Sequence, residues 1–234
     1  MKSADPIKLL VFDLDGTLID SRLDLADSVN ATLSLCGFSN LKEDLIISFV
    51  GDGAEDLLRR ALLAAGLEPR EAETRLDETL RIFLAHYQAH CLVRTLPYPG
   101  AMRFLEGSRH LRKAVLTNKP LSPALRILEG LGMSRHFELV LGGDGPHPKK
   151  PDPGGLGYIL TTLKASASEA ALIGDSLQDL RTARAAQCAF IAFSGGFGDA
   201  QALAAAKPDV TVSHLDQIPS ALQTLANGFR RPNA

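Results

Sequence analysis

The sequence predicts an α/β fold, in which a doubly wound (Rossmann-like), mostly parallel sheet forms the core and a small α-helical cap domain is inserted into it. Short apolar runs recur along the chain, and most lack period-two alternation, which is typical of strands buried on both faces. Helix-like stretches separate these runs, and such alternation favours a parallel sheet. One long stretch after the first run has helical periodicity only, so we expect it to be an insertion.

The expected elements of the core follow one another along the chain. Strands are predicted at 7–12, 113–116, 139–141, 170–173, 189–193 and 209–212. Helices are predicted at 100–111, 122–131, 154–164, 179–186 and 199–206, so that a helix precedes each later strand. The last segment, 227–234, has no periodicity and is expected to fray.

The insertion consists of successive amphipathic helices, predicted at 23–35, 55–65 and 70–88. Its edges fall at Asp20-Ser21 and near the turn at 97–100, where proline and glycine favour a chain reversal. The sequence therefore predicts a catalytic core of residues 1–20 and 94–234 and a helical cap domain of residues 21–93. Two linkers so close together are expected to form a hinge.

The composition is that of a globular protein, and its charge favours a small substrate over a nucleic acid or a membrane. Of 234 residues, 45% are hydrophobic and 22% are charged, and the formal net charge is −2. A dense block of Lys and Arg is absent from the sequence, whereas nucleic acids and anionic membranes usually require one. Cys36, Cys91 and Cys188 are widely separated, which favours a reducing cytoplasm over a disulfide framework or a zinc site. We expect a cytoplasmic monomer or homodimer with neither nucleic acid nor membrane as a partner.

Two carboxylates directly follow the first expected strand, in the string Asp13-Leu14-Asp15-Gly16-Thr17. Ligands of an open parallel sheet bind beyond the carboxyl ends of its strands, so these residues are the first candidates for a site. One carboxylate can attack while the other transfers protons, and the glycine lets the backbone turn tightly toward a ligand. The alternative for a lone aspartate at this place is a capping role in the turn.

Three further polar groups occur at later strand ends or in the connecting loops. Thr117 and Asn118 offer a hydroxyl and an amide that can donate hydrogen bonds to phosphate, although both are also good helix caps. Lys150 can neutralise charge on a transferring phosphoryl group, or can lie on a solvated loop. Asp175 and Asp179 offer the oxygen ligands that Mg²⁺ prefers, although acids are common at helix N-termini. In combination these groups predict a phosphoryl-transfer site.

The combination resembles the haloacid-dehalogenase-like hydrolases. Their four motifs match Asp13-x-Asp15-Gly16-Thr17, Thr117-Asn118, Lys150-Pro151 and Gly174-Asp175-x-x-x-Asp179, over nearly the whole chain. The resemblance implies that a small phosphorylated metabolite is hydrolysed through a phosphoaspartate on Asp13, with Asp15 as the general acid and base.

The resemblance also implies how the remaining residues act. Mg²⁺ would be held by the Asp13 carboxylate, the backbone carbonyl of Asp15 and Asp175, with Asp179 in support. The phosphoryl oxygens would be bound by Thr117, Asn118 and Lys150.

Four longer strings resemble the phosphoglycolate phosphatases within this family, and so does the helical insertion after the first motif. The strings are Pro97-Tyr98-Pro99-Gly100, Thr117-Asn118-Lys119-Pro120, Leu141-Gly142-Gly143-Asp144 and Lys149-Lys150-Pro151-Asp152-Pro153. The cap is expected to close over the site, with Gly51-Asp52-Gly53 as its specificity loop. Asp52 would repel a glycolate carboxylate if it pointed into the site but could bind sugar hydroxyls. A sugar-phosphate phosphatase and a phosphoglucomutase-type phosphotransferase therefore stay open as alternatives.

Overall fold

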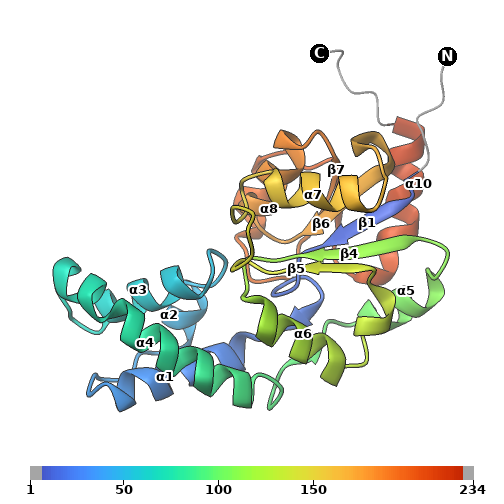
Figure 1. Ribbon diagram of the computed structural model, residues 1–234. Coiled ribbons are helices and arrows are strands. Elements are labelled where there is room, and N and C mark those ends of the chain that lie inside the picture. Colours follow the sequence, from blue (N-terminus) through green and yellow to red (C-terminus); the bar gives the residue numbers. More distant parts are fainter. Residues whose placement is uncertain (1–6, 229–234) are drawn as a thin grey trace.

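The computed structural model describes residues 7–228, and its core is a six-stranded parallel sheet (Figure 1). The strand order is β5-β4-β1-β6-β7-β8, which places β1 between β4 and β6. Each neighbouring pair is parallel. The strands are β1 (Leu9–Phe12), β4 (Arg112–Leu116), β5 (Leu139–Leu141), β6 (Ala170–Gly174), β7 (Ala189–Phe193) and β8 (Val210–Val212).

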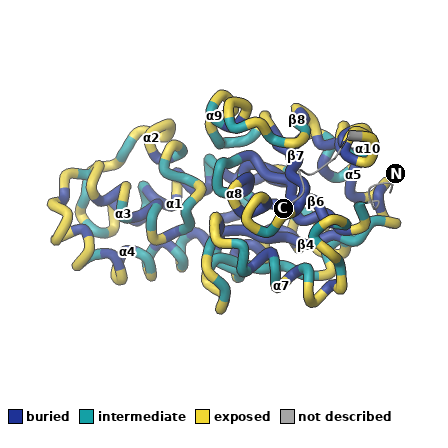
Figure 2. The backbone as a smooth tube through the Cα atoms, turned by 90° about the horizontal axis from the view of Figure 1, so that it is seen from above, coloured by how far each residue is buried: buried dark blue, intermediate teal, exposed yellow. Residues whose placement is uncertain are grey.

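Helices cover both faces of the sheet, which confirms the predicted fold class. Leu10 and Phe12 pack in one hydrophobic cluster with α5 (Ala101–Gly107), α6 (Leu121–Gly130) and α10 (Ile218–Gly228). Leu9 and Val11 pack in a second cluster with α7 (Gly154–Thr162), α8 (Leu177–Ala185) and α9 (Ala200–Ala205). Because successive side chains of a strand point to opposite faces, β1 is buried on both sides. Figure 2 shows that the labelled strands β4, β6 and β7 are mainly buried too.

The four helices of the insertion lie together beside the sheet, at the left of Figure 1. Each has an apolar face that packs against its neighbours, and α1 and α3 both pack on the long α4. Their outer faces are exposed in Figure 2. The helices are α1 (Arg22–Leu35), α2 (Glu43–Ile47), α3 (Ala54–Ala64) and α4 (Pro69–His90).

The two chain segments that connect the insertion to the core run side by side. β2 (Ile19–Asp20) pairs antiparallel with β3 (Leu96–Pro97) in a short ribbon. Next to the ribbon, the buried carboxylate of Asp24 accepts hydrogen bonds from the backbone N–H groups of Arg94 and Thr95 and from the Thr95 hydroxyl, at 2.7–3.0 Å. The start of α1 is thereby tied to the segment that returns to the sheet.

Several elements were not predicted from the sequence. These are α2, α10, the β2–β3 ribbon and three short 3₁₀ helices at Ser134–His136, Ala167–Glu169 and Leu215–Gln217. The end of the chain was expected to fray from residue 227, but α10 continues to Gly228; residues 229–234 lie outside the described part. The exact limits of the cap domain, 21–93, stay a prediction.

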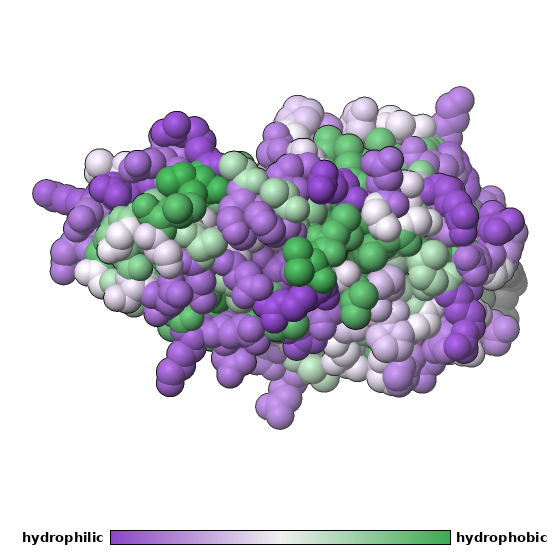
Figure 3. All heavy atoms as spheres, turned by 90° about the horizontal axis from the view of Figure 1, so that it is seen from below, coloured by the Kyte–Doolittle hydropathy of each residue, from purple (hydrophilic) through white to green (hydrophobic). Residues whose placement is uncertain are grey.

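The surface of the molecule is mixed in hydropathy. On the face seen from below, Figure 3 shows hydrophobic side chains in two areas, over the insertion and over the sheet-bearing part, with hydrophilic surface between them. The exposed large hydrophobic residues include Leu35, Leu45, Leu63, Val93, Leu96 and Leu125. Across residues 7–228, none of the helices has the length and apolar character needed to cross a bilayer.

Candidate active site

The polar residues that follow β1, β4 and β6 meet at one edge of the sheet. Phe12, the last residue of β1, is paired with Val115 on one side and with Ile173 on the other. In a parallel sheet this register brings together the residues that follow each strand. Asp13 follows β1 and Thr117 follows β4, so the structure brings these predicted site residues together.

Asp13 and Asp179 share one buried lysine. The Lys150 ammonium lies 2.8 Å from Asp13 Oδ1 and donates to Asp179 Oδ1 at 2.5 Å. All three side chains are almost fully buried. Burial raises the pKa of Asp13 to about 8, and the nearby Lys150 only partly offsets this rise. Burial lowers the pKa of Lys150, but the two carboxylates raise it by more, so Lys150 is a cation.

Asp179 caps helix α8 and also binds Lys150. Its side chain accepts hydrogen bonds from the backbone N–H and the hydroxyl of Ser176, and its own N–H donates to the Ser176 hydroxyl, a capping box that begins α8. The same carboxylate also holds Lys150. The helix cap therefore fixes the lysine at the site.

Asp175 is held in place by four groups around it. Thr17 Oγ1 donates to Asp175 Oδ1 at 3.0 Å, and the N–H groups of Phe197 and Gly198 donate to Oδ2 at 2.8 and 3.0 Å. Gly16 packs against the same carboxylate with φ of +84°, where a Cβ would lie 2.4 Å from Oδ2. Only glycine fits this position, because both the backbone angle and the space exclude a side chain. Burial raises the pKa of Asp175 to about 6.

The three acids form a cluster that can bind a metal ion. Carboxylate oxygens of Asp13, Asp175 and Asp179 lie within 4.8 Å of one another. One lysine cannot neutralise three buried carboxylates, and hard oxygen donors are the ligands that Mg²⁺ prefers. The donor set therefore fits the predicted ion.

Asn118 holds the backbone of Lys150. Its side-chain amide donates to the Lys150 carbonyl at 3.0 Å, and its side-chain oxygen accepts from the Lys150 N–H at 2.8 Å. The same amide donates to the carbonyl of Gly51 at 3.1 Å. Thr117 is also buried, and its hydroxyl oxygen accepts from the Lys119 N–H at 3.2 Å. The phosphate-binding roles of Thr117 and Asn118 stay predictions.

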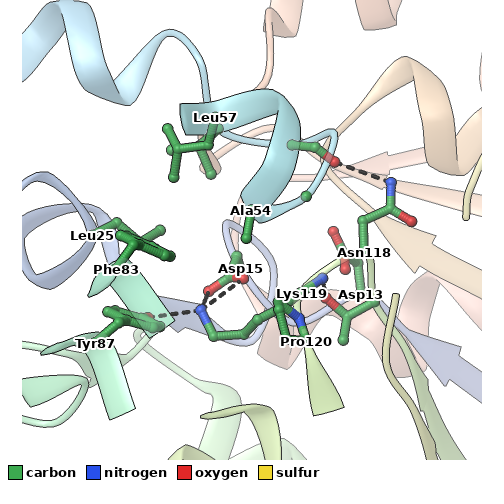
Figure 4. Close-up of a pocket in the computed structure, with 14 residues that line it drawn as sticks. Asp13, Asp15, Leu25, Ala54, Leu57, Phe83, Tyr87, Asn118, Lys119 and Pro120 are labelled. Atoms are coloured by element: carbon green, nitrogen blue, oxygen red, sulfur yellow. Dashed lines mark hydrogen bonds and ion pairs between the residues drawn. The ribbon is translucent and has the colours of Figure 1, made fainter. Parts of the chain in front are cut away.

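Asp15 faces away from the acid cluster, toward a second buried lysine. Lys119 Nζ donates to both Asp15 oxygens, at 2.9 and 3.1 Å, and to the hydroxyl of Tyr87 on α4, at 2.7 Å (Figure 4). The Ser21 hydroxyl also donates to Asp15. Sequence reasoning assigned no site role to Lys119 or Tyr87. Lys119 could have been suspected as a site residue because it directly follows Thr117-Asn118. No sequence feature pointed to Tyr87, because the sequence does not show which side of α4 meets the core.

The expected specificity loop lies against the core. The Asp52 carboxylate accepts a hydrogen bond from the Gln178 side chain at 2.7 Å and is paired with Arg60. Gly51 and Gly53 line the cavity at the site, whereas Asp52 is not part of that lining. The loop thus reaches the site through its backbone.

A cavity of about 50 Å³ separates the insertion from the sheet edge. Figure 4 shows that its two sides differ, since the insertion contributes mainly apolar side chains and the core contributes mainly polar ones. Its fourteen lining residues are Asp13, Asp15, Leu25, Val50, Gly51, Gly53, Ala54, Leu57, Phe83, Tyr87, Thr117, Asn118, Lys119 and Pro120.

Comparison with known families agrees with this geometry. A family model described as haloacid dehalogenase-like hydrolase matches residues 10–193, which span every strand end of the site. The chain belongs to the haloacid dehalogenase-like hydrolase family. The predicted resemblance is thus confirmed for this hydrolase.

Three relatives narrow the class of reaction. This hydrolase is 38% identical to the phosphoglycolate phosphatase of Colwellia psychrerythraea over 81% of its own length and 85% of the relative. It is 39% identical to that of Rhodospirillum rubrum, over 81% of its length and 80% of the relative. A crystal structure of a predicted phosphoglycolate phosphatase from Haemophilus somnus superposes with a TM-score of 0.84 at 29% identity, covering 92% of this chain and 97% of the other. The hydrolase is thereby identified as a phosphatase acting on phosphoric monoesters.

Proposed function

We propose that this phosphatase hydrolyses 2-phosphoglycolate in a Mg²⁺-dependent reaction that passes through a phosphoaspartate on Asp13. The observation that carries the proposal is the Asp13 carboxylate at the end of β1, 2.8 Å from the Lys150 ammonium and within the cluster with Asp175 and Asp179. The substrate is supported by the relatives in Colwellia and Rhodospirillum, which carry the name phosphoglycolate phosphatase.

The reaction takes place in two displacements. The Asp13 carboxylate attacks phosphorus, and the bond from phosphorus to the glycolate oxygen breaks as Asp15 gives that oxygen a proton. A water molecule then attacks the phosphoaspartate and gives its proton to Asp15, which frees phosphate and restores Asp13. Lys150 and the Thr117 hydroxyl bind the phosphoryl oxygens. We refer to Asp13, Thr117, Lys150, Asp175 and Asp179 as the phosphoryl end of the site.

The metal fits among the acids of the phosphoryl end. Asp13, Asp175 and the backbone carbonyl of Asp15 would hold it, with Asp179 in support, consistent with the cluster of carboxylates. When bound, Mg²⁺ supplies positive charge to the phosphoryl oxygens. Lys150, whose ammonium lies 2.8 Å from Asp13 Oδ1, adds to this positive charge.

The lining of the cavity favours a small acid over a sugar. The helical insertion, which we propose acts as the cap, contributes the apolar side chains of Leu25, Leu57 and Phe83 to the cavity wall. Sugar hydroxyls placed against such a wall would lose their hydrogen bonds, which costs about 1–3 kcal/mol for each group. Asp52, the candidate acceptor for sugar hydroxyls, is engaged by Gln178 and Arg60.

The test is phosphate release from 2-phosphoglycolate with Mg²⁺ and with EDTA. We expect Asp13→Asn to lower kcat by at least about 1,000-fold, because an amide is a poor nucleophile. Asp44→Asn on the exposed surface of α2 is the matched control and should stay within about 2-fold of the wild type. Equal turnover by Asp13→Asn, or full activity in EDTA, would overturn the proposal.

The same assay separates the two alternatives. A sugar-phosphate phosphatase would release phosphate faster from a hexose phosphate than from phosphoglycolate. A phosphotransferase would isomerise the sugar phosphate without releasing phosphate. The β-phosphoglucomutase of Clostridium difficile has a similar structure, but at 17% identity it shares the fold alone.

A further inference from the structure

We infer that Lys119 is the residue that selects the substrate, by binding a carboxylate on the alcohol half of the phosphoester. Of the fourteen residues that line the cavity, all within the described part of the chain, Lys119 alone carries a positive charge. Its side chain is almost fully buried. This inference rests on the proposed function and deepens it, because it names the group that recognises the non-phosphoryl half.

The partners of Lys119 leave it no spare hydrogen bond. An ammonium group has three N–H donors, and here they contact the two oxygens of Asp15 and the hydroxyl of Tyr87. The ammonium also lies 4.4 Å from the centre of the Tyr87 ring. Burial raises the pKa of Tyr87, so its hydroxyl is neutral and is not the counter-ion. The only carboxylate paired with Lys119 among the described residues is therefore Asp15.

A substrate carboxylate can replace Asp15 at this ammonium. Both are carboxylates that can accept the same pair of hydrogen bonds, so the exchange keeps the buried lysine paired. A methyl or hydroxyl group in the same place cannot make this exchange, since it offers no charge. The apolar side chains of Leu25, Leu57 and Phe83 make this wall of the cavity less polar and so strengthen a charged hydrogen bond there. We call Lys119, Tyr87 and these three apolar residues the distal end of the site.

Another role for Lys119 is to position Asp15 without contacting the substrate. In that case its loss would slow all phosphoesters equally, because Asp15 acts on each of them. If Lys119 instead binds the substrate, its loss would slow only the hydrolysis of esters that carry a carboxylate. The ratio of kcat/KM between two esters distinguishes the two roles.

The experiment compares 2-phosphoglycolate with ethyl phosphate, in which a methyl group replaces the carboxylate. We expect wild type to prefer phosphoglycolate and Lys119→Met to lower that preference by about 10- to 100-fold, the value of a charged hydrogen bond. Lys119→Arg, which keeps the charge, should keep most of the preference. Lys149→Met is the matched control, because Lys149 is partly exposed, pairs with Glu55 at 3.6 Å and does not line the cavity.

The outcomes are separable. A preference unchanged in Lys119→Met, or a wild type that hydrolyses both esters equally well, would overturn the inference and leave the proposed function intact. No hydrolysis of either ester by the wild type would overturn the proposed function itself. If Lys119→Met does not fold, Lys119→Gln carries the same test, because its amide can still donate to Asp15.

Discussion

Two buried lysines at the site differ in the parts of the molecule that hold them. Lys150 is held by Asp13, which follows β1, and by Asp179 in the first turn of α8, and both belong to the core. Lys119 is held by Asp15 from the core and by Tyr87 from α4 of the insertion. The phosphoryl end is thus built by one part of the fold, and the distal end is built by two.

This difference shows how a site can keep its chemistry while its substrate changes. Strand ends fixed by a parallel register leave little freedom to Asp13 and its neighbours. The distal end depends on which side chains the helices of the insertion present, and these can be replaced without disturbing the sheet. Substitutions at the phosphoryl end should therefore slow the hydrolysis of all phosphoesters, whereas substitutions at the distal end should change the preference between them.

Among the substitutions that compare the two ends, removal of Lys150 should have the largest effect and should slow both esters alike. We expect Lys150→Met to lower kcat by about 100- to 1,000-fold for 2-phosphoglycolate and for ethyl phosphate, because a charge that stabilises the transferring phosphoryl group is lost. Steady-state kinetics on both esters checks this, with circular dichroism to show that the variant folds. A fall in kcat for only one of the two esters would show that the phosphoryl end also takes part in substrate selection.

An intermediate effect is expected from the apolar wall. Leu57→Ala enlarges the cavity and should lower kcat/KM for 2-phosphoglycolate by about 10-fold while improving a bulkier ester such as phenyl phosphate. Thermal unfolding should show a loss of about 2–5 kcal/mol of stability, as for other buried leucines.

Leu62→Ala provides the control for this variant. Leu62 is equally buried in α3 but does not line the cavity. It should lose similar stability with no change in substrate preference. The same shift in preference for both variants would mean that loosening of the insertion, rather than the shape of the wall, sets selectivity.

The smallest effect is expected from substitution of Asp52 in loop 51–53. Asp52→Ala removes a partly exposed pair with Arg60 and one hydrogen bond from Gln178, and such pairs contribute about 0–1 kcal/mol. We expect kcat/KM to change by less than about 5-fold. A much larger fall, seen with 2-phosphoglycolate, would place Asp52 against the substrate and would extend the distal end to the loop.

The six strands of the sheet could be predicted because each is a short run of mainly apolar residues, and the four central strands β4, β1, β6 and β7 are buried along almost their whole length. The short helix α2 could not, because its five residues are too few to show a helical period. The β2–β3 ribbon, with two residues in each strand, is likewise too short to leave a pattern.

The phosphoryl end could be anticipated because its residues directly follow strands or lie in short motifs. Asp13, Lys150, Asp175 and Asp179 do meet in the structure, and Thr117 lines the same cavity as Asp13. The contact between Lys119 and Tyr87 could not be anticipated, since it depends on how α4 is oriented toward the core. A helix period shows which residues share a face but not what that face meets.

The paired linkers determine how the insertion can move. Both chain connections between α1–α4 and the sheet pass through the β2–β3 ribbon, and Asp24 fastens one connection to the other. The insertion therefore has a double attachment and cannot swivel freely, so any displacement must bend or twist the ribbon itself. Loop 51–53 contacts the core through Asn118 and Gln178, so any such bending of the ribbon that moves the insertion away from the sheet edge must also break these two hydrogen bonds.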